Sequence, residues 1–140
     1  MRAFVLFILL LSWIAPATAE EALTEADRTA IREIVERQLE ALQRDDGAAA
    51  FALNSPTVRA QFGTADRFME AMRTEYAALH RPRATTYQDI SLVHGLPVQK
   101  LLVVGPDGRA ATAHLPMQKQ VNGVWRIHGH VLVPLEGEGI

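Results

Sequence analysis

Cysteine is absent from the 140 residues of this chain. Its absence excludes disulfides, thiolate metal sites, cysteine nucleophiles and attachment of lipid to an N-terminal cysteine. Since no covalent cross-link is available, the apolar core alone must hold the fold together.

The chain also lacks an excess of basic residues, because its 14 Lys and Arg are set against 16 Asp and Glu, for a formal net charge of −2. Nucleic-acid binding generally requires a clustered basic face, so we predict no nucleic-acid partner. Phosphate-binding loops, nucleophile elbows and calcium loops are missing as motifs.

Long apolar runs are scarce, and the one that exists lies at the start of the chain, from Phe4 to Ile14. Its 11 residues are too few to cross a hydrocarbon core, which needs about 20. Arg2 precedes the run, and the small residues of 17–19 follow it, as is typical of a secretory signal. We therefore predict cleavage between Ala19 and Glu20, export to the bacterial periplasm or beyond, and no stable membrane anchor.

Residues 20–135 have the length of one domain, and the glycine-containing segment 136–140 is predicted to be a flexible tail. Up to about residue 82, the apolar residues recur at helical spacing. Thr24 is the predicted cap of a first helix, and Asp45 or Asp46 of a second. Pro56 is placed to open a short third helix, and a last helix is expected to carry Phe68 to Leu79.

After residue 82 the apolar residues alternate and turn signals separate them, which is typical of strands. Four strands are predicted, at 87–93, 98–104, 110–120 and 125–133. Asn122-Gly123 predicts a two-residue hairpin turn with positive φ at both positions. The expected fold is α+β, with the N-terminal helices packed on one face of a curved antiparallel sheet of about four strands.

Several phrases of the sequence resemble one bacterial family when they are taken in order. They are Arg44-Asp45-Asp46, Gln61-Phe62-Gly63, Arg81-Pro82-Arg83 and the closing stretch from Asn122 to Ile127. The chain resembles the domain of unknown function 4864 family from about Leu23 to Val133. Such domains look like members of the nuclear-transport-factor-2-like superfamily, in which helices close a curved sheet into a cone with a pocket. The resemblance implies a fold and brings no catalytic residue with it.

A two-residue turn at Asn122-Gly123 would pair Leu115 with His130 and Met117 with His128. These four side chains would then share one face of the sheet, and apolar walls with a few polar groups are typical of small-molecule pockets. With Tyr76 and Gln38 from the helical half, they form our candidate binding site for a small apolar or mixed ligand. The alternative is that this face is simply the core beneath the helices.

In the same register His114 points to the opposite face from His128 and His130, so we predict no metal site. No cofactor is expected. The favoured function is a non-catalytic module that binds a small molecule or a protein. The alternative is an isomerase-, dehydratase- or hydrolase-like enzyme, with Asp46, Asp89 or Tyr76 assisting a pocket histidine.

Two surface features leave further alternatives open. The segment from His80 to Arg83 could bind an anion or serve as a solvated connector. The predicted register leaves Trp125, Ile127, Val131 and Val133 on the sheet face away from the helices. An exposed face as apolar as this indicates a homodimer through the sheet, or a covering element.

Overall fold

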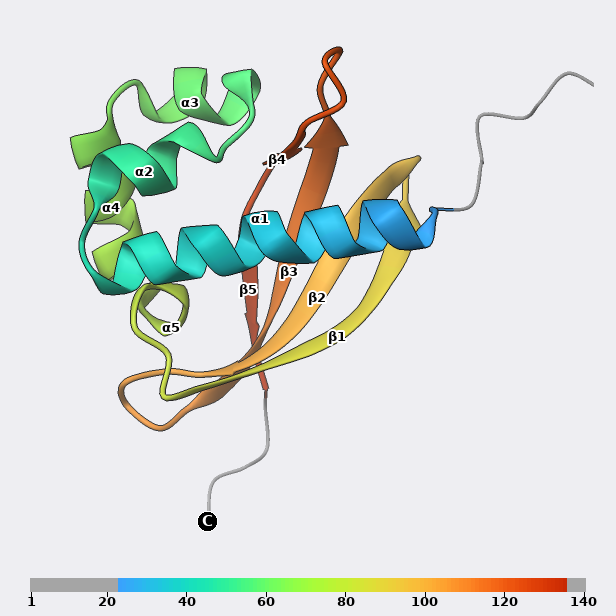
Figure 1. The fold of residues 1–140 in the computed structure, drawn as a ribbon. Helices are drawn as coiled ribbons and strands as arrows, with labels where there is room; N and C mark the ends of the chain where they lie inside the picture. The colour runs from blue at the N-terminus through green and yellow to red at the C-terminus, as the bar shows by residue number, and fades with distance from the viewer. Residues whose placement is uncertain (1–22, 136–140) are drawn as a thin grey trace, which may run out of the picture.

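The computed structural model describes residues 23–135, which form five helices and a five-stranded antiparallel sheet (Figure 1). The predicted signal with its cleavage site at Ala19 and Glu20 lies outside the described residues, as does the predicted tail 136–140. No helix within the described part of the chain is long and apolar enough to cross a membrane. The α+β fold class predicted from the sequence is confirmed.

The helices come first in the chain, and local capping sets their ends. They are α1 (Glu25–Gln43), α2 (Gly47–Ala52), α3 (Pro56–Phe62), α4 (Ala65–Thr74) and α5 (Ala77–His80). Thr24 caps α1 in a capping box with Asp27, and Asp46 caps α2, both as predicted. The single last helix expected over residues 68–79 is divided into α4 and α5 at Glu75 and Tyr76.

The sheet follows, with strands β1 (Ala84–Val93), β2 (Leu96–Val104), β3 (Ala110–Lys119), β4 (Trp125–Ile127) and β5 (Val131–Pro134). The strand order is β1-β2-β3-β4, and β5 pairs with the other end of β3. The predicted fourth strand is therefore two short strands, separated by residues 128–130.

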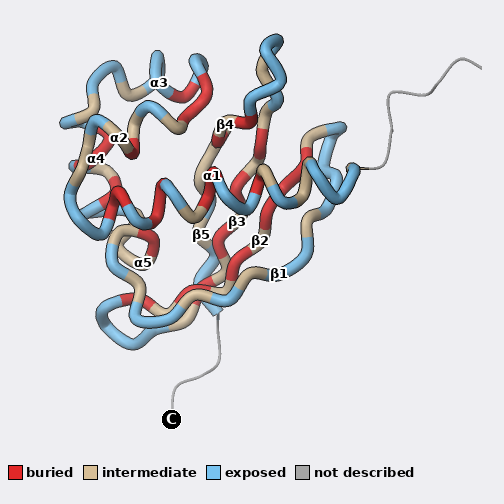
Figure 2. The backbone as a smooth tube through the Cα atoms, in the orientation of Figure 1, coloured by how far each residue is buried: buried red, intermediate tan, exposed pale blue. Residues whose placement is uncertain are grey.

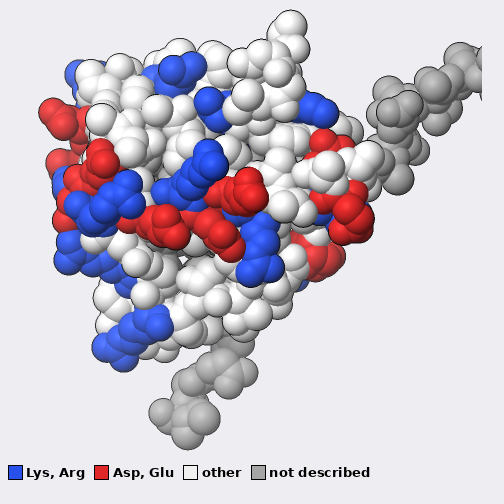
Figure 3. Space-filling model, viewed as in Figure 1, with Lys and Arg blue, Asp and Glu red and all other residues white. Residues whose placement is uncertain are grey.

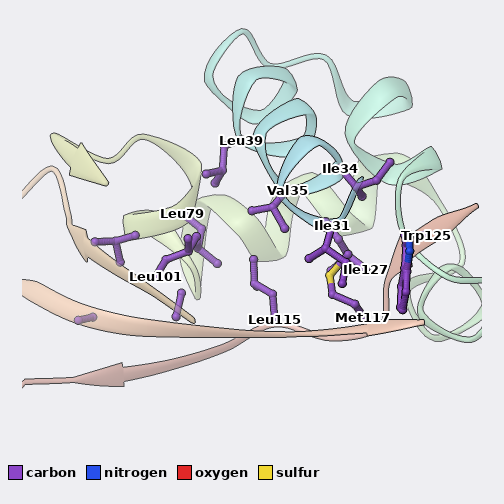
Figure 4. Close-up of a cluster of buried hydrophobic side chains, with 13 residues drawn as sticks. Ile31, Ile34, Val35, Leu39, Leu79, Leu101, Leu115, Met117, Trp125 and Ile127 are labelled. Atoms are coloured by element: carbon purple, nitrogen blue, oxygen red, sulfur yellow. The ribbon is translucent and has the colours of Figure 1, made fainter. Parts of the chain in front are cut away.

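The core lies between α1 and the sheet, which α1 crosses on one face (Figure 1). Buried residues line the side of α1 that faces the strands (Figure 2), and acidic and basic side chains follow its solvent side (Figure 3). Ile31 and Val35 of α1 are fully buried against Leu101, Leu115 and other strand residues (Figure 4). A second apolar cluster, centred on Phe68 and Met72 of α4, packs between α1, α2 and α4.

The β3–β4 hairpin differs from our prediction. Of the two turn residues Asn122 and Gly123, only Gly123 has positive φ, at +85°. The Gln120 N–H donates to the Val124 carbonyl at 2.8 Å. The loop therefore has three residues, Val121 to Gly123, and the Asn122 side chain stabilises it by accepting the Val124 N–H. A glycine in the left-handed region at the last loop position is typical of three-residue hairpins.

The longer loop shifts the register of β4 by one residue, so that Met117 pairs with Ile127. Trp125 and Ile127 therefore lie in the core beneath the helices, and their predicted place on the opposite face is wrong. The break at residues 128–130 restores the predicted register in β5, where His114 pairs with Val131.

Candidate functional site

Leu115 and Met117, two residues of the predicted pocket, are packed in the core. Each has at most 1% of its surface exposed, and both belong to the apolar cluster between α1 and the sheet (Figure 4). The sheet face below α1 is filled at this point. Ligand binding by these residues stays a prediction, and the structure shows them as core residues.

Gln38 and His130, two further residues of the predicted pocket, are joined by a hydrogen bond of 2.7 Å between Gln38 Oε1 and His130 Nε2. The buried Gln38 amide nitrogen donates to the Ala50 carbonyl and to Asn54 Oδ1, both at 2.9 Å. Gln38 Oε1 must therefore accept from His130, which fixes a proton on Nε2. One glutamine thus ties α1 to α2, to the segment after α2 and to the loop between β4 and β5.

Aromatic rings surround the other faces of His130. The Phe68 ring lies 5.7 Å from the imidazole, centroid to centroid, and the Tyr76 ring lies 6.1 Å away in an edge-on arrangement. Burial among these groups lowers the pKa of His130 to about 4. The structure thus brings three of the six candidate pocket residues, Gln38, Tyr76 and His130, together around a neutral imidazole in a packed environment.

His128 stands apart from this group and is held by Ser55, whose Oγ lies 2.8 Å from His128 Nδ1. Ser55 also caps α3 by accepting the Val58 N–H, so its hydroxyl proton is directed at the histidine. A serine beside a histidine is a pattern of nucleophilic catalysis, but Ser55 is fully buried and no substrate could reach it. The pair has a structural role, joining α3 to the sheet.

Neighbouring Asn54 was not among the predicted site residues. It is fully buried and its Nδ2 has no hydrogen-bond partner within residues 23–135. Its side chain accepts from Gln38, and its backbone lies beside Ile127. The only sequence signal for Asn54 was the helix break at Asn54-Ser55-Pro56. The break shows where a helix cap is needed, but it does not show which distant strand this segment contacts.

An open groove lies at the other end of the same sheet face. Its volume is about 720 Å³, a size suited to a small ligand. It runs between the α4–α5 junction, the β2–β3 hairpin and β5. The lining residues are mainly small or apolar: Thr74, Glu75, Ala77, Ala78, Gly105, Pro106, Asp107, Arg109, Ala110, Ala111, Leu132 and Pro134.

The groove is lined by none of the six predicted pocket residues. Leu132, which pairs with Ala113 and packs against the core cluster that contains Leu115, is the link between the predicted face and the observed opening. Small side chains at the hairpin end of the sheet leave space there, whereas large ones fill the space under α1.

A smaller depression of about 230 Å³ lies between α1 and β1. The β1 strand bulges between Tyr87 and Ile90, and Asp89, one of the candidate acids, lies in this bulge. The Arg32 guanidinium stacks on the Tyr87 ring at 4.3 Å, and burial raises the pKa of Tyr87 to about 12. The other candidate acid, Asp46, is the cap of α2.

Two residues of the segment His80 to Arg83, considered from the sequence as an anion site, contact a carboxylate of the protein itself. His80 Nε2 lies 2.8 Å from Asp45 Oδ1, and Arg81 and Arg73 also form ion pairs with Asp45. The His80 hydrogen bond is the main reason that the pKa of Asp45 lies below its ordinary value. Asp45 has positive φ in the turn after α1, so these contacts secure a strained turn.

The remaining histidine of the strands, His114, hydrogen-bonds to Thr112 on the face of the sheet away from the helices. Within residues 23–135, no group of three or more His, Asp or Glu side chains is arranged to hold a metal ion.

Comparison with known proteins agrees with this fold. The chain is similar to a protein of unknown function with a cystatin-like fold from Nostoc punctiforme PCC 73102, known from a crystal structure. The TM-score is 0.57 at 14% identity, and the match covers 83% of this chain and 96% of that one. A likeness at this identity shows the fold alone, so the nuclear-transport-factor-2-like superfamily stays a prediction.

A search of curated proteins found no match. The model of one protein family does match, over residues 24–140, which is most of the chain. The protein therefore belongs to the family described as domain of unknown function (DUF4864).

Proposed function

We propose that this domain is a binding module that holds a largely apolar ligand in the groove between the α4–α5 junction, the β2–β3 hairpin and β5. The observation that carries the proposal is the groove itself, about 720 Å³ in volume and walled mainly by alanine, glycine, proline and leucine. Ligand sites of this size typically combine apolar walls with a few polar groups, here Thr74, Glu75 and Arg109.

The hydrogen bonds of the histidines favour binding over catalysis. His128 is hydrogen-bonded to Ser55 and His130 to Gln38, which are neutral side chains inside the fold. Within the described residues neither imidazole is hydrogen-bonded to a carboxylate, and neither lines the groove. The groove does contain the carboxylates Glu75 and Asp107, but neither histidine of the enzyme alternative reaches it, so the histidine–carboxylate pair expected for acid–base catalysis is not assembled there.

A neutral fluorophore, N-phenyl-1-naphthylamine, tests the groove. We expect its emission to rise on binding to the native protein and to fall at least fivefold for Ala77→Trp, which fills the groove. Ala60→Trp, on the exposed surface of α3, serves as the matched control and should bind normally. Equal binding by both variants, with unchanged melting temperatures, would show that the fluorophore does not use the groove.

We further propose that the domain works after export, on the strength of the signal pattern in residues 1–19. Intact-mass measurement of the protein secreted by a bacterial host should give a chain that begins at Glu20. Full-length protein retained in the cytoplasm would contradict export.

A homodimer through the sheet also remains our proposal, now with a smaller set of residues. The outer face, meaning the sheet face turned away from α1, carries Lys100, Leu102, Thr112, His114, Val131 and Val133. The two valines are 50% and 46% exposed. Lys100 is the only residue of this set with a permanent charge, and Arg126 adds a second charge at the β4 end of the same face. A second copy would therefore cover the uncharged part of the face around the two valines.

A further inference from the structure

Among residues 23–135, β5 is an edge strand, and the phase of its hydrogen bonds shows which of its backbone groups point away from β3. The Leu135 N–H donates to the Ala110 carbonyl at 3.2 Å. In an antiparallel ladder, alternate residues point toward and away from the partner strand. The N–H and C=O groups of Val131 and Val133 therefore point toward β3. The N–H and C=O of Leu132 and the C=O of Pro134 point toward the open edge.

Next to β5, along the same edge of the sheet, β4 already has a backbone partner. At β4, the Ile127 N–H donates to the Leu53 carbonyl at 2.9 Å, and the Ile127 carbonyl accepts from the Ser55 N–H at 2.8 Å. The chain thus lays its own extended segment, Leu53 to Ser55, against β4. No backbone group of residues 23–135 does the same for Leu132.

The open part of the edge borders the groove. Leu132 and Pro134 both line it, and their partners Ala113 and Ala111 belong to the helix-covered face of the sheet. In a strand added to β5, the residue opposite Leu132 would place its side chain on the same face as Leu132. Every second side chain of the added strand would therefore enter the groove.

From these observations, we infer that the ligand of the groove is an extended peptide segment that adds to β5 as a further strand, with apolar side chains at alternate positions. The inference rests on the proposed function, because it uses the same groove. Backbone pairing would supply affinity, and the groove would select small apolar side chains.

Charge gives a second criterion for the peptide. Asp107 and Arg109 of the groove wall form an ion pair with each other, at 3.8 Å. Glu75 also lines the groove and has no ion pair within the described part of the chain. A peptide with lysines beside its apolar positions therefore complements this wall.

The probe is acetyl-Lys-Val-Thr-Val-Lys-amide, titrated against isotope-labelled protein and followed by NMR. We expect the Leu132 amide to shift on binding and its hydrogen exchange to slow at least tenfold. Two N-methylated forms of the peptide, one at both valines and one at the threonine and second lysine, block alternate amides. One form should bind at least tenfold more weakly than the other. The identity of the weaker form shows whether the peptide runs parallel or antiparallel to β5. Equal binding by both forms would overturn the inference.

Charge and alternative occupants are tested in the same assay. Glu75→Gln should weaken peptide binding severalfold. Glu70→Gln, at an exposed position of α4 outside the groove, should leave peptide binding unchanged. A Leu132 amide already protected in the free protein would mean that a second copy or residues 136–140 cover the edge, and would also overturn the inference. If the naphthylamine binds and the peptide does not, peptide addition is refuted and the proposed function still stands.

Discussion

At His130, a loop side chain lies between a glutamine of α1 and two aromatic rings from the α4 region. The imidazole donates from Nε2 to Gln38, a contact that both protonation forms can make, and burial is what favours the neutral form by lowering the pKa of His130. Such a residue makes stability depend on pH between about 6.5 and 4, a range that overlaps the titration of exposed carboxylates only at its acid end. The stability of the fold also depends on the Gln38 side-chain amide, because both its nitrogen and its oxygen form hydrogen bonds inside the protein.

We expect the protein to lose stability as the pH falls from about 6.5 towards 4. The folded pKa of His130 is about 4, below the ordinary value of 6.5, so the unfolded state binds the proton first. The contribution is fully present above pH 6.5 and decreases by as much as ~3 kcal/mol towards pH 4. Urea unfolding at several pH values measures the slope, which His130→Asn should reduce. His114→Asn, on the outer face, is the control and should leave it unchanged.

Replacement of Gln38 by alanine should destabilise the fold by roughly 2–4 kcal/mol. The change leaves the His130 N–H and the Asn54 Oδ1 without their partner in a buried site, and each unmet polar group costs about 1–3 kcal/mol, whereas the Ala50 carbonyl still accepts the Leu53 N–H. Gln43→Ala, at the exposed end of α1, should cost less than 0.5 kcal/mol. Chemical denaturation of both variants tests the difference, and equal losses would show that the network contributes little.

Among the elements, the ends of the helices were predictable and the course of the last strands was not. Caps act on the next three residues, so Thr24 and Asp46 could be recognised from the sequence. Asn122-Gly123 suits both two- and three-residue loops, and only the backbone decides between them. That one residue moved Trp125 and Ile127 into the core. The meeting of Gln38 with His130, and the groove itself, depend on contacts between distant segments.

The three-residue loop predicts a specific cost at Gly123. Its φ of +85° is one that side chains rarely adopt, and no atom of the protein lies near enough to obstruct an added Cβ. Gly123→Ala should therefore lower stability by about 1 kcal/mol through backbone strain alone. In a two-residue turn Asn122 would share this requirement, but here its φ is not positive. Asn122→Ala should lose only its hydrogen bond to Val124, so a larger thermal shift than for Gly123→Ala would contradict the loop geometry.

For the whole molecule, the arrangement of layers determines which surfaces are available to partners. All five helices follow one another before the sheet, and α1 covers one of its faces (Figure 1). Among residues 23–135, no helix covers the outer face and no strand pairs with the open edge of β5. The groove and the outer face lie on opposite sides of the same two strands, β3 and β5, so the proposed ligand and the proposed second copy would not compete for the same surface.

The predicted homodimer is therefore expected to form without closing the groove. Because Val131 and Val133 are 50% and 46% exposed, burying what remains would contribute roughly half of a full burial, about 0.7–1.5 kcal/mol for each side chain, against the loss of freedom on association. Light scattering at micromolar concentration should give twice the mass of the mature chain, and Val131→Asp with Val133→Asp should give the single mass. Thr57→Asp with Thr74→Asp, on exposed parts of α3 and α4, adds the same charge away from the outer face and should leave the dimer intact. Because the valine N–H and C=O groups pair with β3 whatever the side chain, the substitutions should not unfold β5. A native protein that scatters as a monomer would show that the outer face is not used for self-association.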